Sequence, residues 1–380
     1  MQIYSFFPYL QIVFNFFLNL HNILFVVTMV IDFNNLVINN LHPKKEFEKK
    51  IIFFLKEWLS DSKMVKVQTS GSTGTPKVFE IEKERMLNSA KMTCDFLSLK
   101  EGDSALVCLP VEYISGKMMI VRSMERKLNL YIKTPSSKPL EDVNQEIDFC
   151  AMSPLQVENS LEKIHLIKNL IIGGASVSPN LKIKIAQTLK DSNTQTLIYE
   201  TYGMSETLSH IGLKQIYPVS EDYFSVFENV GISMDERGCL KISAPKLNPE
   251  ILQTNDLVEI KNFDSAQLDK KKFRFLGRFD NVINSAGLKI FPEQLEGILK
   301  KQLSNELAFL GLEDEILGQK LILMIEGEET EELQSQLAIL LKEVEDTFSK
   351  NHKPKEIYFL KNFPRITNGK LNRKELLNLL

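Results

Sequence analysis

Hydrophobic residues recur at two different spacings along the chain, and segments of the two kinds alternate. Within residues 44–60, Phe47, Ile51 and Phe54 stand three or four positions apart, which predicts an amphipathic helix. Short apolar runs such as residues 103–110 are typical of strands buried in a sheet. Strands interleaved with helices imply parallel β–α–β units, so the sequence predicts an α/β fold. The same patterns predict further strands at 65–69, 78–81, 128–132, 149–152, 170–172 and 196–200, and further helices at 83–97, 116–126, 153–160 and 179–190.

The pattern changes after Tyr217, where short β segments separated by turns replace the alternation. This change predicts a small β unit packed on the α/β core. From Asn281 onward, two helical and two strand patterns predict a separate small α+β domain. We therefore expect an N-terminal extension at residues 1–28, a large domain at residues 29–279 and a small C-terminal domain at residues 280–380. The expected β segments lie at 239–242, 257–260 and 273–276, the C-terminal helices at 292–303 and 330–348, and the C-terminal strands at 306–311 and 320–325.

The first residues of the chain are apolar and uncharged, with no Asp, Glu, Lys or Arg before Asp32. A membrane helix needs about 20 apolar residues, and here Pro8, Asn15 and other residues interrupt the run. A secretory signal would need a basic start and a cleavage site of small residues, and the segment has neither. We expect translation to start at Met29, because a globular pattern begins there. A membrane segment and a packed N-terminal helix are the alternatives.

Composition and charge narrow the classes of function. With 43% hydrophobic and 25% charged residues among 380, the chain is long enough and apolar enough for two or three globular domains. A formal net charge of -3 provides no basic footprint, so we expect no nucleic-acid partner. The four cysteines are scattered without a Cys-x-x-Cys pair. They predict free thiols and a cytoplasmic location rather than a zinc site or a disulfide framework.

The segment at residues 69–77 carries the strongest chemical signal. Apart from Lys77, its residues are small, hydroxylated, glycine or proline, so backbone amides and hydroxyl groups could reach a bound phosphate. Gly71 and Gly74 allow the backbone conformations that such a cradle needs. The spacing is not that of a Walker motif, and a plain surface loop is the alternative interpretation. The candidate phosphate-binding residues are Thr69, Ser70, Gly71, Ser72, Thr73, Gly74 and Lys77.

Four later segments fit a nucleotide site. The sequence Tyr-Gly-Met-Ser-Glu-Thr at 202–207 supplies an aromatic ring that could stack on a base and a carboxylate that could hold Mg²⁺. Thr-Asn-Asp at 254–256 places a carboxylate at an expected strand start, where it could accept two hydrogen bonds from a diol. The other two segments are Gly-Arg-Phe-Asp at 277–280 and Pro-Arg-Ile-Thr-Asn-Gly-Lys at 364–370.

Taken in order, the five segments resemble the motifs of the adenylate-forming superfamily. This superfamily includes acyl-CoA synthetases, luciferase-like enzymes and the adenylation domains of peptide synthetases. The likeness extends from Val65 to Leu380, and five motifs in one order are far more specific than any one alone. The resemblance implies an enzyme that activates a carboxylate with ATP and Mg²⁺ and passes the acyl group to coenzyme A. It also implies that the small C-terminal domain is mobile and serves two half-reactions.

The resemblance assigns roles to single residues. The loop at 69–77 would hold the β- and γ-phosphates of ATP, with Lys77 steadying the departing pyrophosphate. Lys370 would be the catalytic lysine that bridges the carboxylate and the α-phosphate. Glu206 would bind Mg²⁺ and take part in catalysis, and Asp280 would be the hinge. The other nucleotide-binding residues that the resemblance implies are Gly174 and Ala175 near the adenine, Tyr202 stacked on it with the adjoining Gly203, Ser205 at the α-phosphate, and Asp256 with Arg278 at the ribose hydroxyls.

The chain is short for this superfamily before the phosphate loop. This compactness resembles the short bacterial o-succinylbenzoate–CoA ligases of menaquinone biosynthesis. The box at 109–119 supports this resemblance, with Tyr113 where the wider family commonly has His or another aromatic residue. Tyr113 and Gly173 would line the acid pocket. A dicarboxylate would need a further cation or several hydroxyls there, and Lys117 and Arg122 are the candidate cations.

Other activities stay open at this point. Another aryl- or acyl-CoA ligase and an enzyme that loads a carrier protein share the same motifs. A non-catalytic homologue is disfavoured, because Lys370, Glu206 and Asp256 are all intact. We expect a small carboxylate and coenzyme A as partners, with no stable membrane partner, and leave a homo-oligomer open.

Overall fold

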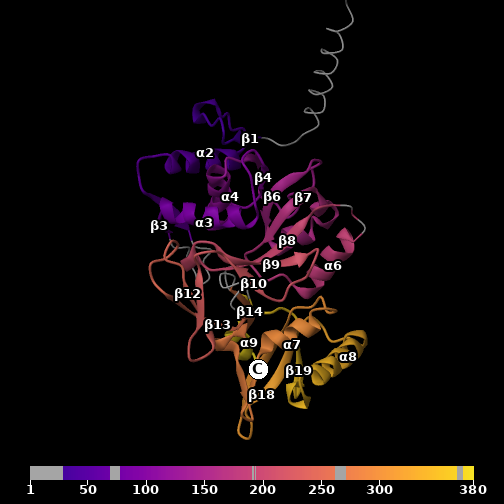
Figure 1. Cartoon of the computed structure of the whole chain (residues 1–380). Helices are drawn as coiled ribbons and strands as arrows, with labels where there is room; N and C mark the ends of the chain where they lie inside the picture. The colour runs from indigo at the N-terminus through magenta and orange to yellow at the C-terminus, as the bar shows by residue number, and fades with distance from the viewer. Residues whose placement is uncertain (1–28, 69–77, 191, 193, 262–270, 366–370) are drawn as a thin grey trace, which may run out of the picture.

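The computed structural model describes residues 29–68, 78–190, 192, 194–261, 271–365 and 371–380. The ribbon has a larger upper part, coloured from indigo to salmon, and a smaller lower part in orange and yellow (Figure 1). The N-terminal extension, the candidate phosphate loop and Lys370 lie outside the described residues. In the part that is described, no helix combines the length and the apolar character needed to cross a membrane.

A twelve-stranded sheet runs through the larger part, in the order β1-β5-β4-β6-β7-β8-β9-β10-β14-β13-β12-β11. Strands β5, β4, β6, β7 and β8 are parallel, and β1 pairs antiparallel with β5 at the edge. This half of the sheet confirms the predicted β–α–β units. Its strands are β1 (Met29–Asp32), β4 (Ser104–Val107), β5 (Asn129–Ile132), β6 (Ile147–Met152), β7 (Ile167–Ile172) and β8 (Leu197–Gly203).

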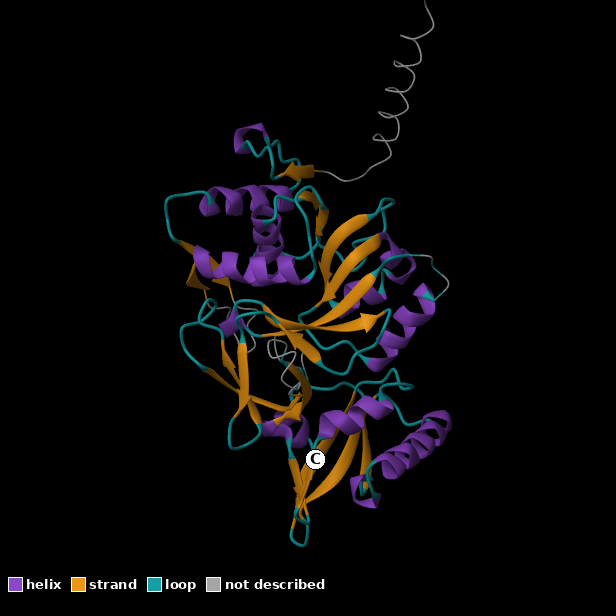
Figure 2. Ribbon diagram, viewed as in Figure 1, coloured by secondary structure: helices purple, strands orange, loops and turns teal. Residues whose placement is uncertain are grey.

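Helices cover both faces of the parallel half, as Figure 2 shows. In β7, Ile171 packs into the core shared with α2, α3 and α4, whereas Leu170 and Ile172 pack into the core shared with α6. Burial on both faces explains why these strands read as continuous apolar runs. The helices of the larger part are η1 (Ile38–Asn40), α2 (Glu46–Trp58), α3 (Lys83–Phe96), α4 (Ile114–Glu125), α5 (Pro154–Glu158), η2 (Leu161–Leu166), α6 (Pro179–Leu189) and η3 (Ser205–Thr207).

The β segments after Tyr217 continue the same sheet. The expected small β unit is present, but it does not form a separate sheet, because β9 pairs antiparallel with β8 and joins it to the core. Among its strands, β13 and β14 pair so that Asp256 lies opposite Arg278. The strands are β9 (His210–Tyr217), β10 (Phe224–Val226), β11 (Gly231–Met234), β12 (Cys239–Ser243), β13 (Leu252–Lys261) and β14 (Lys272–Arg278).

A separate hairpin flanks the candidate phosphate loop. Strands β2 (Met64–Gln68) and β3 (Val78–Glu82) pair antiparallel, with Gln68 opposite Val78 at the end where residues 69–77 connect them. This pairing confirms the two strands that we predicted on either side of the loop.

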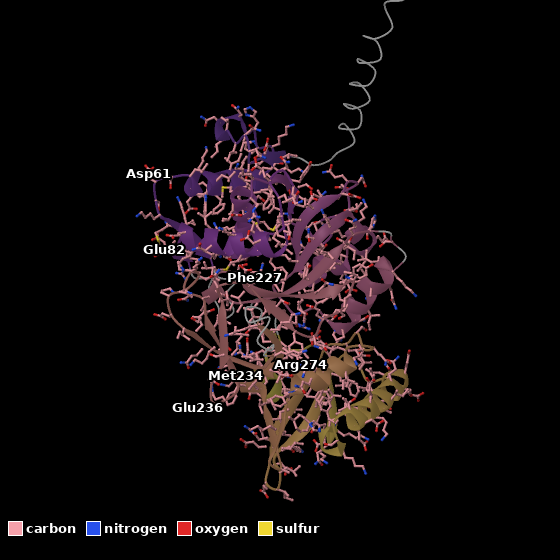
Figure 3. All side chains as sticks on the ribbon, in the orientation of Figure 1. Asp61, Glu82, Phe227, Met234, Glu236 and Arg274 are labelled. Carbon is pink, nitrogen blue, oxygen red and sulfur yellow. The ribbon has the colours of Figure 1, made fainter. Side chains whose placement is uncertain are left out.

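The smaller part has its own sheet and core. Two buried apolar clusters consist entirely of residues after 282, and the division expected at residue 280 stays a prediction. The sheet follows the order β16-β15-β18-β17, with β19 on β18. The elements from the junction onward are η4 (Phe279–Asn281), β15 (Ile283–Ser285), β16 (Leu288–Ile290), α7 (Pro292–Leu299), β17 (Leu307–Asp314), β18 (Gly318–Glu326), α8 (Glu331–Thr347), η5 (Lys350–His352), β19 (Glu356–Leu360) and α9 (Arg373–Leu377). Polar side-chain ends project around the outline of both parts (Figure 3).

Several boundaries differ from the sequence predictions. The helix expected to reach residue 303 ends at Leu299. Asp256 was expected at a strand start but lies within β13, which begins at Leu252. Tyr202 was expected beyond its strand but lies within β8, because pairing with β9 extends that strand through Gly203. The sequence analysis did not predict several strands and one helix, namely β1, β9, β10, β11, β15, β16, β19 and α9.

Candidate active site

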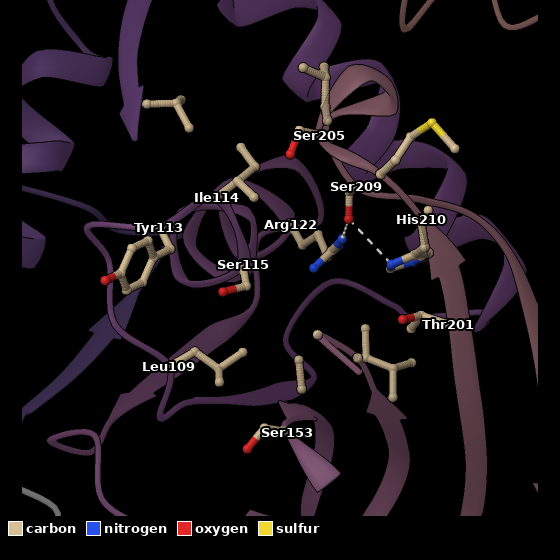
Figure 4. Close-up of a pocket in the computed structure, with 18 of the residues that line it drawn as sticks. Leu109, Tyr113, Ile114, Ser115, Arg122, Ser153, Thr201, Ser205, Ser209 and His210 are labelled. Atoms are coloured by element: carbon tan, nitrogen blue, oxygen red, sulfur yellow. Dashed lines mark hydrogen bonds between the residues drawn. The ribbon is translucent and has the colours of Figure 1, made fainter. Parts of the chain in front are cut away.

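A cavity of about 390 Å³ lies where the parallel strands end. Segments that follow β4, β6, β7 and β8 all contribute to its wall, as expected for a ligand site in an open α/β sheet. The β2–β3 hairpin adds Gln68 and Phe79, so the strands on both sides of the candidate phosphate loop contribute to this cavity. The other lining residues used below are Leu109, Tyr113, Ile114, Ser115, Arg122, Met152, Ser153, Ile171, Gly173, Gly174, Thr201, Gly203, Ser205, Ser209 and His210 (Figure 4).

The cavity brings together six of the candidate site residues that the sequence singled out, namely Tyr113, Arg122, Gly173, Gly174, Gly203 and Ser205. Ala175 directly follows Gly174 but does not line the cavity. Glu206 is exposed in the turn that starts at Ser205, and its backbone carbonyl accepts a hydrogen bond from the Asn248 side chain at 3.1 Å. Tyr202, Asp256, Arg278 and Asp280 form a neighbouring cluster.

The local sequence explains the backbone conformation of two turns at the cavity, one at Ser153 and one between β8 and β9. Ser153 caps α5 through a capping box, in which its hydroxyl accepts from the Gln156 backbone N–H and Gln156 Oε1 accepts from the Ser153 N–H at 3.1 Å. At the β8–β9 turn, a Cβ on Gly203 would lie 2.3 Å from the carbonyl oxygen of Ser209, so only glycine permits this close approach. Leu208, at φ 65°, then turns the chain back toward the cavity.

Tyr202 and Asp256 form the centre of the neighbouring cluster. The Tyr202 hydroxyl donates to Asp256 Oδ2 at 2.5 Å, and Arg278 Nη1 donates to Asp256 Oδ1 at 3.3 Å. The Tyr202 ring packs edge-on against Phe273, with 4.8 Å between ring centroids. Burial, reinforced by the Asp256 carboxylate, raises the pKa of Tyr202 well above its usual value. Tyr202 is therefore a neutral phenol that donates to a fixed carboxylate.

The cluster extends to the junction between the two parts. Arg278 Nη2 donates to Asp280 Oδ2 at 2.8 Å, so one guanidinium bridges Asp256 and Asp280. Asn255 Nδ2 lies 3.2 Å from both carboxylate oxygens of Asp280. The Arg237 guanidinium donates to Asn255 Oδ1 at 2.9 Å and lies over the Phe279 ring. The residue expected at the hinge is thus hydrogen-bonded to the large sheet.

Arg122, one of the two candidate cations, lines the cavity. It lies on α4 seven positions, or two helical turns, after Ser115, and both residues therefore lie on one face. Its side chain is only 2% exposed, and burial lowers its pKa to about 10, which leaves it protonated at neutral pH. Nη2 donates to Ser209 Oγ at 2.8 Å, whereas the buried Nε has no hydrogen-bond partner within the described part of the chain. Among the described residues, no acidic side chain forms an ion pair with Arg122.

Lys117, the other candidate cation, lies elsewhere. It is two positions from Ser115 and does not line the cavity. Its ammonium group lies 4.6 Å from the centroid of the Phe54 ring, between α4 and α2. Burial lowers its pKa, although Glu57 and Glu112 oppose this effect. The sequence offered both cations as candidates for the acid pocket, and the structure places only Arg122 in the cavity wall.

Ser209 and His210, which the sequence analysis missed, complete this wall. His210 Nδ1 lies 3.3 Å from Ser209 Oγ, and Nε2 lies 3.0 Å from Thr93 Oγ1 on α3 (Figure 4). The His210 ring is also packed edge-on against Phe227, with 5.4 Å between the ring centroids. Burial, followed by the nearby Arg122 charge, lowers the pKa of His210 well below its usual value, so the ring is neutral. The only sequence signal was the Ser-His pair that follows the segment at 202–207 after one intervening residue, Leu208.

The sequence profile of AMP-binding enzymes matches residues 29–237 of the chain. The chain belongs to this family of AMP-binding enzymes. The resemblance inferred from the five motifs is thereby confirmed, at the level of AMP-forming acid–CoA ligases. A solved structure from Dyadobacter fermentans, described as an acyl-CoA synthetase (AMP-forming)/AMP-acid ligase II-like protein, is 32% identical. The match covers 92% of this chain and 99% of that protein, with a TM-score of 0.61.

More distant members of the family carry a more specific name. The 2-succinylbenzoate–CoA ligase of Listeria monocytogenes is 26% identical over 333 residues, which cover 81% of this chain and 68% of that enzyme. The enzyme of the same name from Lactococcus lactis is 26% identical over 326 residues, with coverage of 82% and 70%. The O-succinylbenzoate coenzyme A synthetase of Bacillus subtilis, solved with ATP and magnesium ion, shares the fold at 20% identity and a TM-score of 0.66. That match covers 82% of this chain and 69% of the synthetase.

Proposed function

We propose that this member of the family is an ATP-dependent, AMP-forming ligase that joins o-succinylbenzoate to coenzyme A in menaquinone biosynthesis. The observation that carries the acid assignment is Arg122, a buried cation in the cavity wall with a polar partner but no described acidic one. The names of the relatives from Listeria monocytogenes and Lactococcus lactis support the same acid.

A buried guanidinium without a counter-ion is costly, because it loses hydration and regains little from a single hydroxyl. A substrate carboxylate in the cavity would offset that cost through charge-assisted hydrogen bonds to Nε and to a terminal nitrogen. The acid needs one carboxylate for activation and a second for Arg122. Leu109, Ile114, Met152 and Ile171 provide apolar wall for a ring between the two carboxylates.

The chemistry would proceed in two steps. A carboxylate oxygen attacks the α-phosphorus of ATP, the bond to the β-phosphate oxygen breaks, and pyrophosphate leaves. The sulfur of coenzyme A, having lost its proton, then attacks the acyl carbon, and the bond to AMP breaks. Neither step transfers electrons to an external acceptor. The protein's part is to hold the reacting groups in line and to neutralise phosphate charge.

The nucleotide would bind across the Tyr202–Asp256 cluster. Asp256 already accepts from a hydroxyl and a guanidinium, so two ribose hydroxyls could exchange with these donors. Gly173, Gly174 and Ala175 would line the adenine, and Ser205 would contact the α-phosphate. The loop at 69–77 and Lys370 keep their proposed roles at the phosphates and the reacting carboxylate.

Glu206 fits a magnesium site in which the nucleotide phosphates supply part of the ligands. Its carboxylate is exposed beside the cavity, and the described residues contain no cluster of three acidic, His or Cys side chains that could hold a metal alone. Mg²⁺ that reaches an enzyme on nucleotide phosphates needs only one or two protein carboxylates. When bound, the ion would neutralise phosphate charge, while Glu206 would orient it.

Product analysis with a panel of acids tests this proposal. The purified full chain is incubated with ATP, Mg²⁺, coenzyme A and either o-succinylbenzoate, benzoate, malonate or a fatty acid. We expect o-succinylbenzoyl-CoA and AMP in equal amounts by mass spectrometry, and pyrophosphate exchange into ATP without coenzyme A. Thioester formation from another acid and none from o-succinylbenzoate would overturn the substrate. Adenylate transfer to a carrier protein but never to coenzyme A would overturn the ligase assignment.

A further inference from the structure

Arg122 is held by a chain of hydrogen bonds that leads away from the cavity. Arg122 Nη2 donates to Ser209 Oγ, Ser209 Oγ lies against His210 Nδ1, and His210 Nε2 lies against Thr93 Oγ1. Thr93 Oγ1 in turn donates to the Ser89 carbonyl at 3.2 Å, one turn earlier on α3. The chain therefore connects three elements, α4, β9 and α3, through polar side chains.

The direction of every proton in this chain follows from its two ends. Thr93 uses its only proton on the Ser89 carbonyl, so its oxygen must accept from His210 Nε2–H. His210 Nδ1 is then unprotonated and accepts the proton of Ser209. Because that proton points at His210, the Ser209 oxygen presents its lone pairs to Arg122. A neutral His210 is the one form of the ring that completes this order.

We infer that His210 and Thr93 are positioning residues, which fix the Ser209 hydroxyl so that the Arg122 guanidinium faces the second anionic group of the acid. This inference rests on the proposed function, because it concerns selection of a dicarboxylate. Thr93 is fully buried and does not line the cavity, so it acts on the acid only through His210. No described residue accepts a hydrogen bond from Arg122 Nε, which leaves that donor for the ligand.

This hydrogen-bonded relay, which runs from Arg122 through Ser209 and His210 to Thr93, also explains why a histidine is suitable at position 210. The ring has one acceptor and one donor on opposite sides, and the two partners lie at 3.3 Å and 3.0 Å. A glutamine side chain also carries one acceptor and donors, so it could replace the ring. A leucine side chain of similar size could not, and the Ser209 hydroxyl would be free to turn its proton toward Arg122.

The test compares matched acids on matched variants. Steady-state pyrophosphate exchange is measured with o-succinylbenzoate and with two monocarboxylate analogues, each of which lacks one of its carboxylates. We expect Thr93→Val and His210→Leu to raise KM for o-succinylbenzoate by about 5- to 10-fold, with kcat changed by less than about 2-fold. For the accepted analogue, KM should change by less than about 2-fold. His210→Gln should restore KM for o-succinylbenzoate to within about 2-fold of the wild type.

Two results would overturn the inference. An equal change in KM for both acids would mean that His210 and Thr93 only support the fold, and an unchanged KM for o-succinylbenzoate would mean that they do not act on Arg122. If the wild type activates no dicarboxylate, the proposed function fails separately. In that case nitrogen-15 NMR of the histidine rings still decides the relay, with His210→Gln used to assign the signals. A neutral ring protonated at Nε2 is expected at pH 7, and protonation at Nδ1 would refute the relay.

Discussion

Arg122 and Glu200 are both buried charged residues, but they differ in how far other protein groups compensate their charge. Glu200 is 5% exposed, and its carboxylate accepts from Lys182 at 2.8 Å, Lys214 at 3.0 Å and the Val177 backbone N–H at 2.9 Å. Its charge is fully compensated within the protein, so its role is structural. Among the residues that the structure describes, the Arg122 guanidinium has only a hydroxyl partner, and that deficit points to a ligand.

The Glu200 charge has a predictable dependence on pH. Burial alone would raise the pKa of Glu200, but Lys214 and Lys182 outweigh it, so the pKa lies below the usual 4.5. The unfolded chain therefore binds the proton first, and the stabilisation is complete above pH 4.5 and is lost as the pH falls below that value. We expect Glu200→Gln to lower the free energy of unfolding by about 3 kcal/mol at pH 7. In thermal unfolding, the difference from wild type should shrink below pH 4.5; a difference that grows on acidification would contradict this.

At the scale of elements, Glu200 also fixes the loop that follows β7. Its bond to Val177 and its ion pair with Lys182 on α6 hold the second half of this loop and the start of α6 against β8, and Lys214 on β9 binds the same carboxylate. Gly174, at φ 86°, turns this loop at the cavity. The residues proposed to line the adenine are thus supported by a buried ion-pair cluster one layer behind them.

The C-terminal part contains a second buried ion pair that holds its last helix. Glu296 on α7 is 5% exposed and accepts from Arg373 Nη2 on α9 at 2.6 Å and from the Phe309 backbone N–H at 2.9 Å. Arg373 Nη1 also donates to the Phe309 carbonyl at 3.1 Å. The pair therefore joins α9 to α7 and β17, immediately after the segment that contains the candidate catalytic lysine.

Removal of one member of this pair should destabilise the C-terminal part. Arg373→Met leaves a buried carboxylate without its cation, and we expect a loss of about 3 kcal/mol in the free energy of unfolding. The rate of backbone amide hydrogen exchange should increase more in α9 and β17 than in strands β4 to β8. Lys342→Met, which removes an exposed ion pair with Asp346 on α8, is the control and should cost less than about 0.5 kcal/mol. Equal effects of the two substitutions would argue against a buried structural pair.

Long periodic segments were predictable from the sequence, and short or shared ones were not. The apolar spacing was long enough to predict the helices α2, α3 and α8 and the strands β4 to β7. Strands β15 and β16 have three residues each, too few for a period, and β8 was extended only by pairing with β9. The motifs indicated candidate nucleotide-binding residues, which stay predictions, but they did not indicate which face of α4 meets the cavity. That face separates Arg122 from Lys117, and it depends on tertiary packing.

At the scale of the whole molecule, one polar network crosses the junction between the two parts. Arg278 bridges Asp256, near the proposed ribose site, and Asp280, the proposed hinge. From the other side, Glu293 on α7 accepts from Asn281 Nδ2 at 2.6 Å. If the C-terminal part rotates between two half-reactions, these contacts must either break or move with it. Nucleotide binding at Asp256 would compete for the same guanidinium, and this competition would link ATP binding to the hinge.

The central claim is that Arg122 selects an acid with a second carboxylate. The most direct measurement is kcat/KM in pyrophosphate exchange for o-succinylbenzoate and its accepted monocarboxylate analogue, in wild type and Arg122→Gln. We expect Arg122→Gln to lower kcat/KM for o-succinylbenzoate by about 10- to 100-fold, as for loss of a charged hydrogen bond, and to leave the analogue within about 3-fold. Lys117→Gln, a buried cation outside the cavity, should affect both acids alike. Equal losses for both acids in Arg122→Gln would contradict the account.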